Sequence, residues 1–175
     1  MNKNFEIRKS LPSDLASLEE LYTEAFPDED LLPLVRELLQ ETAIVLSLVG
    51  TSGSTLVGHI AFTNCGIAGH TDKVVLLGPL AVTPIWQRQG IGSAIVREGL
   101  KRMENAGVTR VCVLGDPAYY GRLGFAPETG VMPPYALPAE WRGAWQTIQL
   151  LSTEPPLQGK LSVPPPWLQP ALWAP

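Results

Sequence analysis

The sequence predicts one α/β domain, in which helices and strands alternate along the chain. Residues 74–82 form an almost wholly apolar run, which at this length fits a strand buried on both faces. Residues 91–106 place apolar side chains at helical spacing, and Gly107 follows as a stop signal. Residues 43–49 and 55–63 are β-rich runs joined by a turn of glycine, serine and threonine. These signals predict a sheet that is covered by helices.

The other elements follow from the same kinds of signal. Pro27 ends the first predicted helix, and little regularity remains after Phe125. Apolar and polar residues that alternate predict a short strand, and apolar residues at helical spacing predict helices. Short runs of apolar or β-branched residues predict further strands. The expected segments are a strand at 5–8, helices at 14–26 and 31–41, and strands at 108–114 and 146–151.

Length and composition bound the class of protein. A chain of 175 residues is long enough for one well-packed domain and short for two. An apolar content of 45% supports a real core, and a net charge of −4 gives no general attraction to nucleic acid or to an anionic membrane. That charge favours cationic or neutral acceptors if the site shares its sign. We therefore expect no nucleic-acid partner and no membrane partner.

The two cysteines, Cys65 and Cys112, lie far apart in the sequence and form neither a disulfide framework nor a metal cluster. We expect no bound metal. Cys112 is expected in the core, whereas Cys65 lies near a loop, where a reactive thiol is the less favoured interpretation. The N-terminus lacks the apolar core of a signal peptide, and no run approaches the ~20 apolar residues of a membrane span. A cytoplasmic location is expected.

The composition changes after residue 153. Residues 1–153 are predicted to form the domain, and residues 154–175 a tail rich in proline and tryptophan. Proline favours extended structure, but the tryptophan and leucine side chains are too apolar for a solvated tail. We expect the tail to pack on the domain or on a second subunit, which would make a homodimer. A proline-rich ligand for another protein is the remaining alternative.

The loop at residues 87–93 lies between the apolar strand and the helix that follows it. The first N–H groups of a helix lack intrahelical partners, and the helix dipole adds about half a positive charge there, so a phosphate is well received. Gly90 and Gly92 let the main chain come close to such an anion. A glycine pair alone can be only a tight turn. Two nucleotide-binding loops are disfavoured, because Ile95 replaces the third glycine of G-x-G-x-x-G and no G-K-S/T sequence occurs.

The loop resembles motif A of the GNAT N-acetyltransferase superfamily, Q/R-x-x-G-x-G/A, which Gln87, Gly90 and Gly92 match here. In that family the preceding strand ends in a bulge, and Gly78-Pro79 is a pair suited to interrupting a ladder. A second match ends at Phe125, where residues 120–125 have the motif B form Y-x-x-x-G-F. The amino-acid sequence around this motif is similar to that of the YhbS-like branch of the superfamily.

The resemblance implies a GNAT fold, with a mixed, mostly antiparallel sheet of about six or seven strands that splay at the acyl-CoA site. It also implies an N-acetyltransferase that carries the acetyl group of acetyl-CoA to the amine of a small molecule or protein. Leu80, Ala81 and Val82 would bind the pantetheine arm through their main chain, and the helices at 14–26 and 31–41 would wall the acceptor site. The expected pyrophosphate-binding residues are Gln87, Arg88, Gln89, Gly90, Ile91, Gly92 and Ser93.

Two catalytic residues are candidates. Tyr120 matches the tyrosine of motif B and would protonate the departing thiolate, although a tyrosine at this position can also serve only the core. No acid occurs in residues 73–83, so His59 is the best titratable candidate for the base. A buried histidine held by hydrogen bonds, Asp116 as the base, and proton transfer to solvent are the alternatives. An acyl-CoA sensor with little transferase activity is the competing function.

Overall fold

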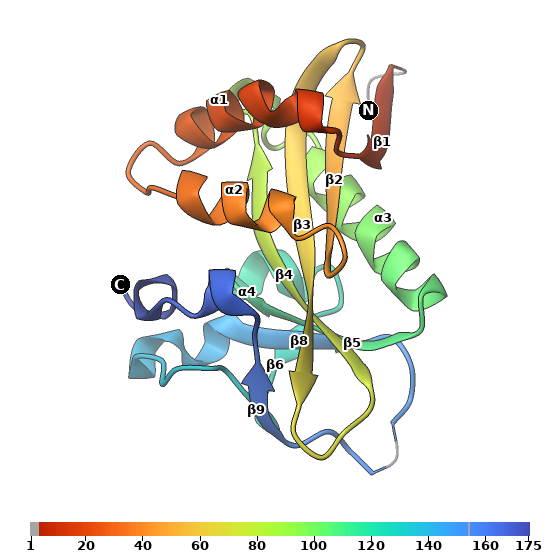
Figure 1. Cartoon of the computed structure of the whole chain (residues 1–175), viewed down its shortest axis with the longest axis vertical. Coiled ribbons are helices and arrows are strands. Elements are labelled where there is room, and N and C mark those ends of the chain that lie inside the picture. The colour runs from red at the N-terminus through yellow and green to blue at the C-terminus, as the bar shows by residue number, and fades with distance from the viewer. Residues whose placement is uncertain (1–3, 154) are drawn as a thin grey trace. The chain divides into compact units, whose positions relative to one another are not determined.

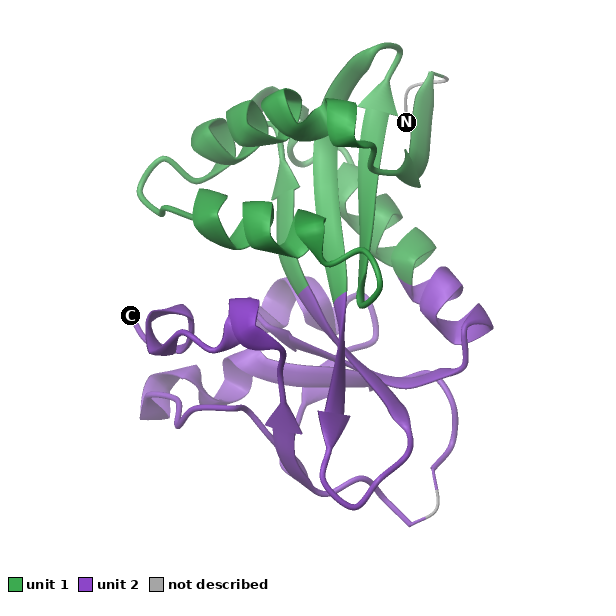
Figure 2. Cartoon of the chain, viewed as in Figure 1, with its two compact units in different colours: residues 1–62, 78–99 green, residues 63–77, 100–175 purple. Residues whose placement is uncertain are grey.

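The computed structural model describes residues 4–153 and 155–175 and shows the helices and strands in Figure 1. The chain forms two compact units, coloured separately in Figure 2. Unit 1 comprises residues 1–62 and 78–99, and unit 2 comprises residues 63–77 and 100–175. The domain boundary predicted between residues 153 and 154 does not coincide with a boundary of either unit.

Strands of both units contribute to one mixed, mostly antiparallel sheet. The order β1-β2-β3-β4-β5-β8-β6 forms its main path, and β9 pairs with β3 and β7. The pairs β4–β5 and β7–β9 are parallel. The sheet confirms the predicted fold class, and in the described residues two further strands, β7 and β9, pair outside the main path. The strands are β1 (Phe5–Lys9), β2 (Val45–Ser52), β3 (Thr55–Ile67), β4 (Lys73–Val82), β5 (Val108–Leu114), β6 (Ala126–Pro127), β7 (Val131–Met132), β8 (Trp145–Gln149) and β9 (Gly159–Ser162).

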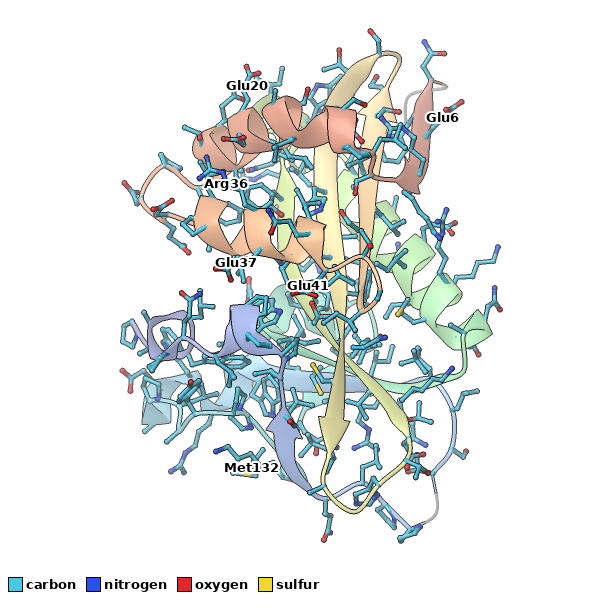
Figure 3. All side chains as sticks on the ribbon, in the orientation of Figure 1. Glu6, Glu20, Arg36, Glu37, Glu41 and Met132 are labelled. Carbon is cyan, nitrogen blue, oxygen red and sulfur yellow. The ribbon has the colours of Figure 1, made fainter. Side chains whose placement is uncertain are left out.

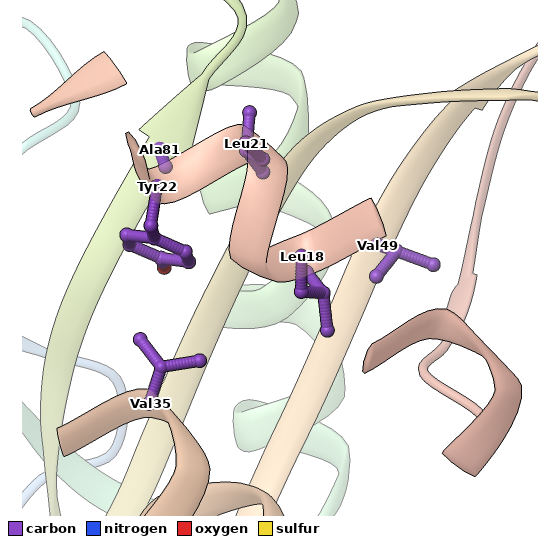
Figure 4. Close-up of a cluster of buried hydrophobic side chains, with 6 residues drawn as sticks. All are labelled: Leu18, Leu21, Tyr22, Val35, Val49 and Ala81. Atoms are coloured by element: carbon purple, nitrogen blue, oxygen red, sulfur yellow. The ribbon is translucent and has the colours of Figure 1, made fainter. Parts of the chain in front are cut away.

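In unit 1, α1 (Leu15–Ala25) and α2 (Leu32–Gln40) pack against one face of the sheet. Both helices present apolar residues at helical spacing, and those residues meet side chains of β2 and β4. Figure 4 shows the resulting cluster. Its buried members are Leu18, Leu21, Tyr22, Val35, Val49 and Ala81.

The opposite face of β2 and β3 is covered by α3 (Ile91–Asn105). Neighbouring residues of a strand point to opposite faces, so Val49 contacts the α1 cluster while Gly50 lies under Ile95. A Cβ atom on Gly58 would lie 2.6 Å from Cδ1 of Ile95. A Cβ atom on Gly99 would lie 2.1 Å from the ring of Phe62. Glycine therefore allows α3 to lie close to β3 within unit 1.

In unit 2, the segment after residue 154 is part of the sheet and the core. Leu161 of β9 pairs with Ile67 of β3, and the side chains of Trp167 and Trp173 are buried. The Trp167 indole N–H donates to Thr63 Oγ1 over 3.2 Å, and the Trp173 indole N–H donates to the Trp167 carbonyl over 3.1 Å. The prolines limit the regular structure of this segment, and the segment packs into unit 2 through its buried tryptophan side chains. None of the helices in residues 4–153 and 155–175 has the length and apolar character of a membrane span.

We expect Gly99→Ala to destabilise the protein, although alanine is the better helix former by about 1 kcal/mol. The new methyl group would overlap the Phe62 ring, and overpacking of this kind costs about 1–3 kcal/mol. Urea denaturation measures the difference. Gly121→Ala in α4 (Pro117–Gly121) is the control, because nothing lies within 4 Å of its added Cβ. Equal stability of the two variants would contradict the close packing of α3.

Candidate functional site

The loop before α3 has the main-chain geometry of an anion-binding concavity. Arg88 has φ +61° and Gly90 has φ +81°, with Gln89 between them at negative φ. Such alternation directs successive N–H groups toward one point, as in the nests that bind phosphate. The first α-helical bond runs from the Ala94 N–H to the Gly90 carbonyl. In the described part of the chain, the N–H groups of residues 91–93 have no acceptor, so they are available to an anion.

Side chains of the loop hold its shape. Gln87 Nε2 donates to the Val82 carbonyl over 2.9 Å, and Gln89 Nε2 donates to the Ile85 carbonyl over 3.1 Å. Both glutamines are therefore engaged with the main chain that precedes the helix. Arg88 is exposed, and Ile91 is buried under the start of α3. The loop thus offers an anion mainly its N–H groups, with the Arg88 guanidinium free to approach.

The end of β4 exposes main-chain groups beside this loop within unit 1. The parallel ladder with β5 ends at Leu77 and Val113, whereas β4 continues to Val82. The Thr83 N–H donates to the Val57 carbonyl, so the main chain of Thr83 faces β3. Because the polar groups of a strand alternate sides, those of Ala81 also face β3 and those of Leu80 and Val82 face away. Leu80 therefore offers its main-chain groups to a ligand, and Val82 offers its N–H, because the Val82 carbonyl already accepts from Gln87.

Tyr120 lies at the end of α4 in unit 2, with 8% of its surface exposed. Its ring packs edge-on against Tyr119 and Phe125, and against Gly115, where a Cβ atom would lie 2.5 Å from it. Burial raises the pKa of its phenol, so the group stays protonated at neutral pH. The hydroxyl makes no hydrogen bond to the described residues and is not among their fully buried polar atoms. It is therefore a protonated donor without a protein acceptor.

His59 occupies a buried polar network in unit 1. Its Nδ1 hydrogen-bonds with the Tyr22 hydroxyl over 2.6 Å, and its Nε2 hydrogen-bonds with Ser47 Oγ over 2.7 Å. Burial lowers the pKa of the imidazole to about 3, against a smaller opposing effect of the Asp14 charge. The ring is neutral and both of its nitrogens are engaged. This geometry favours the alternative of a histidine held in the core over proton transfer from a substrate.

The remaining candidates also have structural partners. Asp116 accepts a hydrogen bond from the Ala118 N–H over 2.9 Å and caps α4. Burial raises the pKa of Cys65 to about 12, and it raises that of Cys112 as well, so neither thiol is nucleophilic at neutral pH. Sequence reasoning missed Ser47 as a partner of His59, because no local pattern joins positions that far apart. No cluster of metal-binding side chains is present among the described residues.

These features define an α/β protein with an anion cradle at a helix start and a broken strand ladder beside it. The chain belongs to the acetyltransferase (GNAT) family, whose sequence model matches residues 15–125. The family and its branch were both correctly predicted from motifs A and B.

Relatives and solved structures agree with this membership. An uncharacterised N-acetyltransferase of Escherichia coli K12, YjhQ, is 35% identical over 82% of this chain and 82% of its own length. YhbS from the same strain is 32% identical over 68% of this chain and 72% of its own. The structure of E. coli YhbS with CoA aligns with a TM-score of 0.84 at 26% identity, covering 95% of this chain and 93% of that one. A Brucella melitensis GNAT acetyltransferase with acetyl-CoA aligns at 0.74 and 30% identity, covering 93% and 97%.

The lowered pKa of His59 predicts a pH dependence of stability. Between about pH 3 and 6.5 the unfolded chain binds a proton at this histidine and the folded chain does not, so stability falls as the pH falls. The contribution is about 1.4 kcal/mol per pH unit in that window. Chemical denaturation of the wild type and of His59→Gln at pH 7 and pH 5 measures it. The variant should lose less stability on acidification, and parallel pH profiles would contradict the burial of a neutral ring. His70→Gln, at the other histidine, is the control.

Proposed function

We propose that this N-acetyltransferase binds acetyl-CoA through the residue 87–93 loop and the end of β4, and transfers the acetyl group to a primary amine. The acceptor is a small molecule or a protein. The observation that carries the proposal is the set of unpartnered N–H groups at residues 91–93, beside the positive φ angles of Arg88 and Gly90. The CoA and acetyl-CoA held by the two structural neighbours support the same ligand here.

The chemistry is direct attack. The amine nitrogen forms a bond to the thioester carbonyl carbon, the carbon–sulfur bond breaks, and CoA leaves as a thiolate. The main-chain groups of Leu80 and Val82 would hold the pantetheine arm, and an N–H group among them would polarise the carbonyl. Ala81, which the family resemblance also assigned to this task, would contribute through packing because its polar groups face β3.

Two proton transfers complete the reaction. Tyr120 would donate its proton to the thiolate and recover it from solvent, since its hydroxyl is protonated and has no protein acceptor. The amine must lose a proton, and we assign this step to solvent. His59 would serve as the base only if it gave up its hydrogen bonds to Tyr22 and Ser47. We therefore give His59 the role of fixing α1 against β3.

One observation favours a second candidate, an acyl-CoA sensor with little transferase activity. No acid occurs in residues 73–83, and both ring nitrogens of His59, the best titratable candidate, are already engaged in hydrogen bonds. Steady-state assays with a panel of amines separate the two functions. Thiol release with any acceptor supports the enzyme, and tight CoA binding with no release on every acceptor supports the sensor.

The remaining sequence expectations belong to the same proposal. They are a cytoplasmic location, the absence of nucleic-acid and membrane partners, and a homodimer as one state of the protein. The net charge of −4 supports the expected absence of nucleic-acid and membrane partners, and the two cysteines, which are free thiols in the structure, support the expected cytoplasmic location. The homodimer is an expectation from the apolar side chains of the C-terminal tail alone.

Gly90→Glu should weaken CoA binding on the order of a hundredfold, because a carboxylate would face the pyrophosphate at the helix start and like charges in contact cost several kcal/mol. Calorimetric titration with CoA measures the loss. Gly53→Glu is the matched control, since both glycines have positive φ and open space around an added Cβ. Backbone strain should lower the stability of both variants alike. Unchanged CoA affinity in Gly90→Glu would contradict the cradle assignment.

Tyr120→Phe should lower kcat by about a hundredfold or more, the usual value of a positioned proton donor. The KM for acetyl-CoA should stay close to that of the wild type, because the ring and its packing remain. Tyr119→Phe removes the neighbouring hydroxyl and is expected to leave kcat unchanged. Wild-type turnover in Tyr120→Phe would exclude the tyrosine as the acid while leaving CoA binding at the loop intact.

A further inference from the structure

Unit 2 contains a cavity of ≈ 720 Å³, and the acetyl transfer proposed above assigns no role to the residues that line it. This volume lies within the range of roughly 300–1,000 Å³ that small-molecule sites occupy. Most of its lining is apolar, and Met132, which Figure 3 labels, is 54% exposed. The residues that matter here are Pro127, Glu128, Met132, Leu137, Arg142 and Trp145.

Trp145 is held rigidly where it lines the cavity. Its indole N–H donates to the Val131 carbonyl over 2.8 Å, and its ring packs edge-on against Trp173 at 5.8 Å between centroids. Its main-chain carbonyl accepts from the Glu128 N–H over 3.0 Å. The proline at 127 limits motion of the adjoining wall. An apolar ligand would therefore meet a preformed surface, which lowers the entropic cost of binding.

Glu128 contributes little negative charge to the cavity. One of its carboxylate oxygens accepts from Arg110 over 2.9 Å and from Thr147 over 2.8 Å. The other accepts from the N–H groups of Gly130 and Val131 over 2.6 and 3.1 Å. Burial raises the pKa of this carboxyl, but these hydrogen bonds and the Arg110 charge outweigh burial and lower it. The carboxylate is ionised, neutralised by Arg110 and saturated with hydrogen bonds.

Arg142 is the charged group that remains available. It lies on the 3-10 helix Ala139–Ala144, its side chain is exposed, and it makes no hydrogen bond or ion pair with the described residues. The Tyr135 hydroxyl, also in the lining, has no partner among those residues either. The cavity therefore combines an apolar wall with the Arg142 cation and with the hydroxyls of Tyr135 and Thr129, none of which has a partner among the described residues.

We propose that this cavity binds a small amphiphilic anion, with an apolar body against Trp145 and Leu137 and a single carboxylate or sulfonate paired with Arg142. The Arg142 charge would repel a cationic ligand, and a strongly polar ligand would make no favourable contact with the apolar wall. Binding at this cavity can be measured with a fluorescent probe and without an acceptor amine, so it can be tested apart from activity.

The probes are the dye 8-anilino-1-naphthalenesulfonate and its uncharged analogue N-phenyl-1-naphthylamine, titrated into the full chain and followed by fluorescence. Saturating CoA is present throughout, so that dye is excluded from the CoA-binding site. We expect one sulfonate dye per chain. Arg142→Ala should lower the affinity for the sulfonate dye by about tenfold, the usual worth of a hydrogen bond to a charged group. The affinity for the uncharged analogue should not change. Arg142→Lys should restore most of the affinity for the sulfonate dye.

Two further variants test the position of the dye. Ala136→Trp places a large ring in the lining and should abolish binding of both probes, whereas Ala139→Trp, outside the lining, should not. Arg97→Ala on α3 controls for the loss of one positive charge. Thermal unfolding verifies that each variant is folded. Several equivalent dyes per chain, or sulfonate affinity that is the same in Arg142→Ala and the wild type, would overturn the proposal.

Discussion

The close approach of α3 to β3 is the constraint on which the candidate site depends. Gly99 lies against the Phe62 ring and Gly58 lies under Ile95, so any side chain at either glycine would move the helix away from the sheet. The first residue of α3, Ile91, is buried at the same interface. The start of the helix is therefore fixed within unit 1, and its unpartnered N–H groups keep one direction. A glycine inside the helix costs about 1 kcal/mol of helix propensity, which the close packing of Phe62 and Ile95 offsets.

Many elements of the fold, and the loop of the candidate site, could be predicted because their sequence signals are local. The strands at residues 73–82 and 108–114, the helix that ends before Gly107, and the glycines of the loop were all predicted from short runs of sequence. The partners of His59 could not be predicted, since Tyr22 and Ser47 lie 37 and 12 residues away in the chain. The pairing of β9 with β3 was missed for the same reason. Local periodicity predicts an element, but only the fold determines which element pairs with it.

Buried polar groups in this protein divide into two kinds. His59 and Glu128 are fully provided with hydrogen-bond partners, which the cost of burying an unpaired polar group requires. These partners keep the imidazole neutral and the carboxylate ionised, and they hold strands and turns together. Other groups have no partner among the described residues. They include the N–H groups of residues 91–93, the Tyr120 hydroxyl and the exposed Arg142 side chain. Function is expected where hydrogen-bonding capacity remains, and these three positions were therefore assigned to ligands.

This division also bears on how the acceptor amine loses its proton. The central strand carries no acid, and the imidazole of His59, with a pKa of about 3, is a very weak base at neutral pH. A base of that strength would accept almost no proton from an alkylammonium, whose pKa is about 10. Water can accept the proton before or after attack, provided that the neutral amine is held in line with the thioester. The fold then accelerates the reaction chiefly by alignment and by main-chain polarisation of the carbonyl, which together can account for many orders of magnitude in rate. A side-chain base is therefore not required by the chemistry.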